Sequence, residues 1–339
     1  MGGCTTVVGP LFPPRERELV WPPPPDPPRI RFVGTFATTK DLNVKRESFL
    51  GLADFILGDE KPEELTGPRS VALAPGGRWL WVADPGRRAL HRFDLELREY
   101  ARIERAGGAP LQTPVWVSPG PEGRMLVCDS RARAILRFDA ASGEALDPLP
   151  LPPSLKRPVA AAWDPETREI FIVDAVSHDL KVLTEEGVLK RVIGRRGTEP
   201  GCFNYPCALA LGADTLWVAD AGNHRIQGLS LEGRPRVSFG SAGDAPGYLA
   251  LPKGIATDSR GHVYVVDARF ENVQIFAPDG RLLLVFGEEG RGDGQFWLPS
   301  GIFIDESDRI WVCDSYNRRL QVFQYLDVGS EPQNGEGEE

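Results

Sequence analysis

The chain repeats one short sequence pattern six times, and this repetition constrains its fold more than any other feature. Each copy places an apolar run before an aspartate and returns to apolar residues six and nine positions later. The aspartates are Asp84, Asp129, Asp174, Asp220, Asp267 and Asp314. Their intervals are 45, 45, 46, 47 and 47 residues, a period typical of β-propeller blades. We therefore expect six equivalent structural units.

Each copy predicts four β-strands. The residue two positions before every aspartate is β-branched, and in five copies the residue before that one is aromatic, as in "LWVAD" from Leu216. Such runs are typical of strands that are buried on both faces. A segment led by proline precedes each run, and copies three to five end in a further strand, such as "LLVFG" from Leu283. Four strands are the unit of a propeller blade.

The two ends of the repeat region complement each other. After Phe323 the chain runs into the polar, acidic "SEPQNGEGEE", so the sixth copy lacks an outer strand, whereas "RIRFVGTF" from Arg29 resembles an outer strand without a copy of its own. We predict an all-β, six-bladed β-propeller of four-stranded blades over residues 29–326. The N-terminal strand completes the last blade and removes the open sheet edge. Residues 327–339 are expected to form a disordered acidic tail.

The composition agrees with this fold and narrows the classes of partner. There are 37 Gly and 31 Pro among 339 residues, which suits many short strands joined by tight turns. The net charge of −9 means that the molecule as a whole should repel nucleic acid and anionic lipid. No apolar run approaches the roughly 20 residues that a membrane-spanning helix needs.

Two segments resemble a known family. "ADAGNHRIQ" from Ala219 and "GRGDGQFWLPSGIFID" from Gly290 are similar to the NHL-repeat family of six-bladed propellers. The resemblance extends over roughly residues 29–326 and is strongest in copies four to six. Copies one and two lack the Asn-His pair, and copy three keeps only the histidine. The resemblance implies the propeller fold, and some propellers of this family bind RNA.

We interpret the six aspartates as structural residues. A carboxylate at the end of the second strand can accept backbone N–H groups of the turn or pair with a nearby arginine. The alternative is a ring of functional carboxylates.

The sequence contains few residues that favour catalysis. The four histidines, His91, His178, His224 and His262, are expected at places from which they cannot meet around one zinc ion. No carboxylate follows the proline that leads each blade, where the residues are Arg69, Val115, Val159, Cys207, Lys253 and Ser300. We therefore predict no metal site and no cofactor. The alternative is a metal-dependent lyase or lactonase, as in propeller enzymes that resemble this family.

Arginines follow the repeat aspartates closely, so one face of the ring is expected to be basic. They are Arg87, Arg88, Arg131, Arg133, Arg225, Arg269, Arg318 and Arg319. These arginines either pair with the neighbouring aspartates or form a surface for a protein or an anionic ligand. The candidates for a binding face are Arg69, Arg88, Trp116, Arg133, Arg225, Lys253, Arg269, Trp297 and Arg319. We expect a monomeric, non-enzymatic binding or scaffolding propeller with a protein partner; a small anionic ligand and RNA are the alternatives.

Residues 1–28 precede the ring, and eight prolines lie between Pro13 and Pro28, which predicts an extended tether. Cys4, after small residues and before this tether, resembles the mature start of bacterial lipoproteins of the NHL type. The resemblance implies a lipidated, extracytoplasmic protein, for which a signal peptide would have to lie upstream of Met1. The alternatives are a cytoplasmic protein with an ordinary start and N-myristoylation of "MGGCTT".

The remaining cysteines fall into two groups. Cys128 and Cys313 occupy the same place in two apolar runs and are expected to be buried. Cys202 and Cys207 bracket "CFNYPC" and could close a small disulfide loop, which would indicate an oxidising compartment. Two free thiols are the alternative.

Overall fold

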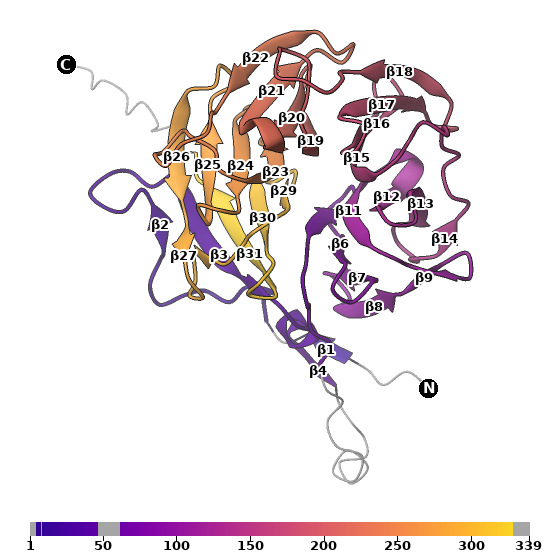
Figure 1. Ribbon diagram of the computed structural model, residues 1–339. Helices are drawn as coiled ribbons and strands as arrows, with labels where there is room; N and C mark the ends of the chain where they lie inside the picture. The colour runs from indigo at the N-terminus through magenta and orange to yellow at the C-terminus, as the bar shows by residue number, and fades with distance from the viewer. Residues whose placement is uncertain (1–4, 8, 47–61, 328–339) are drawn as a thin grey trace, which may run out of the picture.

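The protein is a six-bladed β-propeller (Figure 1). The structure is a computed structural model that describes residues 5–7, 9–46 and 62–327. The strands of each blade are given from the inner strand outwards. Blade 1 consists of β5 (Ser70–Leu73), β6 (Trp79–Asp84), β7 (Ala89–Asp94) and β8 (Glu99–Ile103), and blade 2 of β11 (Pro114–Pro119), β12 (Arg124–Asp129), β13 (Ala134–Asp139) and β14 (Ala145–Leu146). Blade 3 consists of β15 (Pro158–Asp164), β16 (Glu169–Asp174), β17 (Asp179–Thr184) and β18 (Leu189–Ile193).

The next two blades repeat the four-stranded pattern, and the sixth extends it. Blade 4 consists of β19 (Pro206–Leu211), β20 (Leu216–Asp220), β21 (Arg225–Leu229) and β22 (Pro235–Phe239), and blade 5 of β23 (Pro252–Thr257), β24 (Val263–Asp267), β25 (Asn272–Phe276) and β26 (Leu282–Phe286). Blade 6 consists of β29 (Ile302–Ile304), β30 (Arg309–Asp314), β31 (Arg319–Tyr325), β3 (Ile30–Phe36) and β2 (Val20–Trp21). The sixth sheet therefore has five strands, one more than the sequence predicts, because β2 pairs with the outer side of β3.

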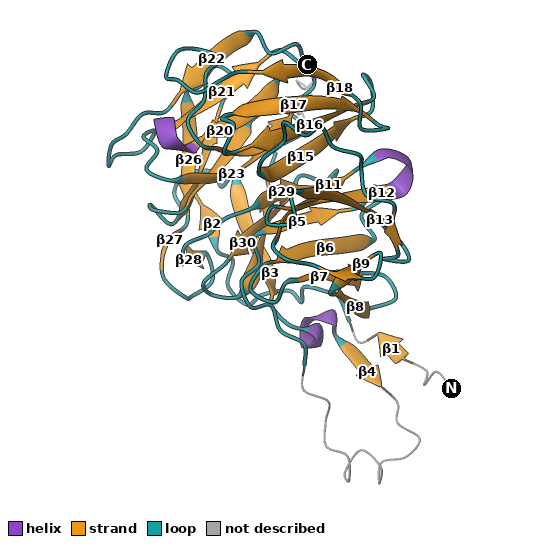
Figure 2. Ribbon diagram, turned by 45° about the vertical axis from the view of Figure 1, so that its right-hand side comes forward, coloured by secondary structure: helices purple, strands orange, loops and turns teal. Residues whose placement is uncertain are grey.

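Small elements lie between and beside the blades. They are the hairpin of β9 (Arg105–Ala106) and β10 (Ala109–Pro110), the parallel pair β27 (Glu288–Glu289) and β28 (Gln295–Phe296), the short 3-10 turns η1 (Thr39–Leu42), η2 (Pro121–Gly123) and η3 (Ala221–Asn223), and the pair β1 (Thr5–Val7) and β4 (Val44–Arg46). Figure 2 shows the last pair outside the ring. Among the described residues, no helix has the length and hydrophobicity that crossing a bilayer requires.

The N-terminal strand closes the ring, as the sequence predicts. β3 pairs antiparallel with β31, with Phe32 opposite Phe323 and Phe36 opposite Leu320. The inner strand of blade 6 also contacts that of blade 1, so every blade has two neighbours. The outer edge of β31 is thereby covered by a segment from the other end of the chain.

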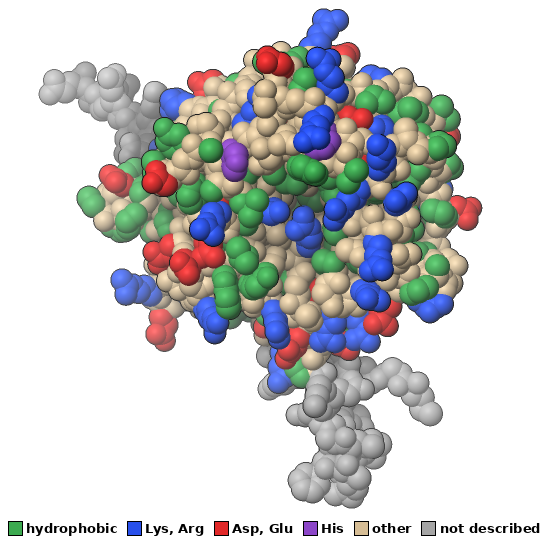
Figure 3. Space-filling view, viewed as in Figure 1, with side chains coloured by type: hydrophobic (Ala, Val, Ile, Leu, Met, Phe, Trp, Pro, Cys, Tyr) green, Lys and Arg blue, Asp and Glu red, His purple; other side chains and the backbone are tan. Residues whose placement is uncertain are grey.

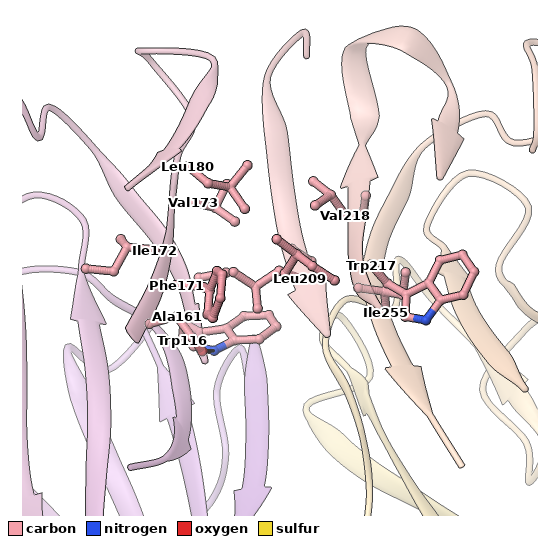
Figure 4. Packing of buried hydrophobic residues seen from close by; sticks show 14 of the residues in the cluster. Trp116, Ala161, Phe171, Ile172, Val173, Leu180, Leu209, Trp217, Val218 and Ile255 are labelled. Atoms are coloured by element: carbon pink, nitrogen blue, oxygen red, sulfur yellow. Dashed lines mark hydrogen bonds between the residues drawn. The ribbon is translucent and has the colours of Figure 1, made fainter. Parts of the chain in front are cut away.

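The core lies between the blades rather than in the middle of the ring. The aromatic residues of the second strands are buried, and in Figure 4 Trp217 extends from its strand among apolar residues of the neighbouring blades. This explains why the second strands lack polar alternation: both of their faces are covered by a neighbouring sheet. These buried residues are Trp81, Phe171, Trp217, Tyr264 and Trp311.

Part of the N-terminal segment packs against blade 6, which corrects the prediction of an extended tether over residues 1–28. Phe12 contacts Trp311, with 6.0 Å between ring centroids, and Trp21 lies 5.8 Å from Phe323. Phe12 rests on Gly34, where a Cβ atom would come within 2.5 Å of its ring. The prolines predict an extended chain, but the apolar residues between them bury enough surface to hold residues 11–21 on the ring. Cys4 and residues 328–339 of the expected tail lie outside the described residues.

Candidate functional site

Each of the six repeat aspartates ends a second strand and holds the loop that leads into the inner strand of its own blade. Every carboxylate is buried and accepts a backbone N–H group of that loop over 2.6–2.8 Å. The donors are Thr66, Gln112, Lys156, Asn204, Ala250 and Trp297, in blade order. A buried carboxylate with several N–H donors is stable as an anion, so these aspartates fix the corners of the ring.

In blades 4 and 6 the corner aspartate is also paired with an arginine. Arg225 Nε lies 2.9 Å from Asp220, and Arg319 Nε lies 2.7 Å from Asp314. These guanidinium side chains are only 14% and 11% exposed. They also donate to backbone carbonyls of the adjacent loops. Arg225 and Arg319, two of the predicted binding residues, therefore belong to the structural corners.

Blades 1 and 2 have alanine where blades 4 and 6 have this arginine. Ala89 and Ala134 occupy the fifth position after the aspartate, and the arginines of these turns stand earlier in the sequence. Arg88 and Arg133 adopt left-handed backbone conformations, with φ of 53° and 55°, and are exposed. Neither has a side-chain hydrogen bond or ion pair with the described residues. Arg88 and Arg133 are therefore not paired with the aspartates of their corners.

The turns of blades 1 and 2 border a cleft of about 450 Å³ on this face. Its lining residues are Arg87, Arg88, Glu104, Pro110, Leu111, Gln112 and Arg131. Arg87 Nε donates to Thr66 Oγ1 over 2.7 Å, which holds its side chain at the edge of the cleft. The single carboxylate, Glu104, already faces Arg102 at 3.2 Å. The cleft therefore has an excess of positive charge.

The inner strands begin with a ring of irregular residues at the mouth of the central channel. In blades 2 to 5 the register shifts directly after the leading proline, so that Val115, Val159, Cys207 and Lys253 have no partner in the strand ladder. Arg69 and Ser300 stand at the same position in blades 1 and 6. Bulges of this kind redirect side chains and are frequent near binding sites.

Figure 3 looks onto the face that carries the turns between second and third strands. Lys and Arg side chains surround the middle of this face, whereas most Asp and Glu side chains lie towards its edge. Arg269, in the turn of blade 5, is exposed and has no side-chain partner among the described residues. The face is therefore locally basic although the chain is acidic overall.

The two predicted aromatic contact residues differ in exposure. Trp116 is buried: its indole N–H donates to Ala161 O over 2.8 Å, and Figure 4 shows it beside Phe171. It links blades 2 and 3, and with only 9% of its surface exposed it offers little area for a partner. Trp297 is partly exposed beside Arg291, whose guanidinium lies 4.7 Å from the ring. A smaller hollow of about 170 Å³ lies next to it.

Cys202 and Cys207 are free thiols, so the disulfide loop that their spacing suggests is not formed. Cys202 is buried under the loop at Gly197. Cys207 lies on β19, and its thiol donates to Pro252 O of blade 5 over 3.2 Å. Cys128 and Cys313 are buried, and burial raises the pKa of both thiols well above the ordinary value.

The four histidines lie in separate environments. His91 is buried between Tyr100 and Asp84, and His262 binds Asp258 over 2.7 Å. His178 Nδ1 accepts the N–H of Tyr205, and His224 Nδ1 lies 3.0 Å from Ala250 O. Burial, assisted by Arg196, lowers the pKa of His178. Within residues 5–7, 9–46 and 62–327, no three His, Cys, Asp or Glu side chains form a group that could hold a metal ion.

The arrangement agrees with the family that the sequence suggests, because residues 296–323 match the NHL repeat. This chain is a six-bladed β-propeller that contains an NHL repeat. The NHL propeller is similar to NHL repeat-containing protein 2 of Bos taurus, with 25% identity over 167 residues. That match covers 40% of the present chain and only 23% of the bovine protein.

Solved structures resemble the NHL propeller in fold alone. Virginiamycin B lyase of Staphylococcus aureus is 14% identical, with a TM-score of 0.56 over 77% of this chain and 96% of the lyase. A gluconolactonase of Xanthomonas campestris is 19% identical, with a TM-score of 0.59 and coverages of 77% and 87%. An auxiliary nutrient binding protein of Bacteroides thetaiotaomicron is 13% identical, with a TM-score of 0.60 and coverages of 79% and 71%. Enzymes and a binding protein thus share this architecture.

Proposed function

We propose that this NHL propeller is a non-enzymatic binding module that presents the cleft between blades 1 and 2 to an acidic segment of a protein partner. The observation that carries the proposal is the cluster of Arg87, Arg88 and Arg131 around one cleft whose only carboxylate is paired elsewhere. Arginine is favoured in protein interfaces because its planar guanidinium group can bind both oxygens of a carboxylate at once.

The position of these arginines supports a role in recognition over one in stability. The corners of blades 1 and 2 are held by backbone N–H groups, with His91 beside Asp84 in blade 1. The arginines contribute no ion pair to Asp84 or Asp129 and leave their charged ends at the surface. A basic patch on an acidic protein attracts an acidic segment and speeds the encounter at low salt.

Membrane tethering through Cys4 is a separate proposal. It rests on the sequence around Cys4 and on the prolines that follow it. A lipid at this position would hold the propeller at a membrane surface. The intact mass of the N-terminal peptide from native cells tests it: an acyl mass on Cys4 supports the proposal, and an unmodified cysteine contradicts it.

Binding of a labelled oligoglutamate peptide, followed by fluorescence anisotropy, tests the proposed function. We expect salt-sensitive binding that weakens about tenfold when Arg88 and Arg131 are both changed to Glu, because reversal of two charges removes more than about 1.4 kcal/mol. Arg281→Glu is the matched control, since Arg281 is exposed in the turn between β25 and β26 on the opposite face. Equal affinity for the double variant and the control would contradict the proposal.

A further inference from the structure

Two cations at the mouth of the central channel have no counter-ion among the residues that the structure describes. Arg69 and Lys253 are half-buried, and neither makes a side-chain hydrogen bond or an ion pair with the described residues. The other four residues of the mouth are uncharged at neutral pH: Val115, Val159, Cys207 and Ser300. A charge that is partly withdrawn from water without a partner is costly.

The electrostatics of the mouth show that these groups influence one another. Burial lowers the pKa of Lys253, and the nearby Arg69 lowers it further. Burial raises the pKa of Cys207, while Lys253 and Arg69 act in the opposite direction. Contacts between the inner strands agree: Cys207 Sγ lies 3.2 Å from Pro252 O, a Cβ atom on Gly254 would lie 2.3 Å from Ser300 O, and Ser300 Oγ lies 3.1 Å from Arg69 O. Arg69, Lys253 and Cys207 therefore share one region, although they belong to blades 1, 5 and 4.

The backbone under both cations is fixed by the neighbouring blade. Ser300 Oγ donates to Arg69 O over 3.1 Å, and Ser315 Oγ donates to Pro68 O over 2.6 Å. On the other side, Cys207 Sγ donates to Pro252 O, next to Lys253. Gly301 leaves no room for a Cβ atom, which would lie 2.5 Å from Arg69 O. The backbone that carries the two cations is thus fixed, so a ligand has to order only their side chains.

We propose that the mouth of the central channel binds a small oxyanion, a carboxylate or a phosphate, between Arg69 and Lys253. The guanidinium fork of Arg69 suits two oxygens of such a group, and Lys253 adds a compact charge. The apolar side chains of Val115 and Val159 on the other blades leave no second charged subsite, so the ligand is expected to carry one anionic group. This site lies apart from the cleft of the proposed function and binds a different class of ligand.

Thermal unfolding in matched ionic strength tests the site with defined probes. Inorganic phosphate and acetate are titrated separately against chloride as the reference. We expect at least one of them to raise Tm in a saturable way, and the two titrations tell a phosphate site from a carboxylate site. Absence of a saturable rise with both anions would overturn the proposal.

Two variants locate the effect. Arg69→Gln and Lys253→Met should each abolish the anion-dependent rise in Tm. Lys253→Met should also raise Tm in chloride alone, since it removes an unpaired cation. Arg281→Gln is the control, because Arg281 is exposed in the turn between β25 and β26 on the opposite face. A rise in Tm that persists in both channel variants would place the anion elsewhere.

The thiol of Cys207 supplies a second readout that does not depend on stability. The saturating anion should slow alkylation of Cys207 several-fold, measured on the peptide by mass spectrometry, because it neutralises the cations that favour the thiolate. Unchanged alkylation alongside an unchanged Tm would contradict the site. The peptide-binding experiment on Arg88 and Arg131 uses other residues, so failure of one proposal leaves the other intact.

Discussion

The corners of blades 4 and 6 and those of blades 1 and 2 use the same aspartate in different ways. In blades 4 and 6 an arginine five residues after the aspartate enters the corner and is nearly buried there. In blades 1 and 2 alanine stands at that position, and arginines one to three residues earlier remain at the surface. A shift of one residue on a left-handed turn thus decides whether an arginine supports the fold or faces solvent.

This difference explains why the number of arginines in a turn does not predict how many of them are free to bind a partner. All six turns have a residue with positive φ at the fourth position after the aspartate, so their backbones agree. These residues are Arg88, Arg133, His178, His224, Glu271 and Arg318. What differs is the side chain at the fifth position. In blades 4 and 6 it is an arginine that pairs with the aspartate, whereas in blades 1 and 2 it is an alanine that cannot. The comparison can be tested by removing or adding these groups.

The largest difference is expected for the aspartates themselves. Asp220→Ala removes the partner of Arg225 and of the Asn204 N–H, and we expect a loss of about 4 kcal/mol, typical of a broken buried ion pair. Asp129→Ala leaves only backbone N–H donors without their acceptor and should lower the free energy of unfolding by about 2 kcal/mol. Urea unfolding measures both values. Equal losses would show that the arginine adds nothing to the corner.

The arginines should differ by less. Arg225→Ala removes charge-assisted hydrogen bonds to Asp220 and to Cys202 O, so a loss of about 2 kcal/mol is expected. Arg88→Ala removes an exposed side chain without a partner and should change stability by less than about 0.5 kcal/mol. Both are read from the same unfolding curves. A large loss for Arg88→Ala would assign that residue to the fold and remove it from the proposed interface.

Acid titration tests the corner of blade 1. Burial opposes ionisation of Asp84, but the nearby His91, whose Nε2 lies 3.4 Å away, and hydrogen bonds from the backbone N–H groups of Thr66 and Gly67 outweigh it and lower its pKa. Its contribution to stability is therefore present above the unfolded value and is lost as the pH falls below about 4 towards the folded pKa. Asp84→Asn should reduce this acid-dependent loss, measured as the free energy of unfolding against pH. An unchanged slope would assign the acid sensitivity to other carboxylates.

The smallest effect is expected from transferring the arginine. Ala134→Arg places a guanidinium at the position in blade 2 that Arg225 occupies in blade 4. We expect a gain of at most about 1 kcal/mol, because the pair is partly exposed and the side chain loses freedom. The rise in Tm relative to Ala134→Gln, which has no charge, checks it. No rise would mean that the loop of blade 2 cannot accept the side chain.

The repeat predicts the fold well because it reports burial directly. The period of the aspartates fixes six blades, and the unmatched "RIRFVGTF" identifies β3, which spans Ile30–Phe36. The sequence does not predict the packing of Phe12 and Trp21, since the prolines around them indicate extended chain and conceal two apolar anchors. It also does not show that Trp116 is buried, because the first residues of an inner strand face either the channel or the next blade, and spacing does not distinguish these directions.

The site was only partly predictable for a related reason. The sequence indicates a basic face but does not separate paired from unpaired arginines, because pairing depends on the loop that folds over each turn. The alanines Ala89 and Ala134 were the available signal: an arginine that pairs stands where they do. The convergence of Arg69 and Lys253 follows from ring closure, which places blade 1 next to blade 6, and so near blade 5, although blade 1 is far from both in the sequence.

The pairing of β3 with β31 also sets the order in which the molecule can assemble. Ile30 pairs with Tyr325, so β3 can find its partner only after all six blades have been made. Until then its apolar residues Ile30, Phe32 and Phe36 have no native contact, and closing so long a loop is slow. The emerging chain therefore carries an unpaired apolar strand until the last blade is made. Misassembly with another copy of the chain is expected to begin at this blade.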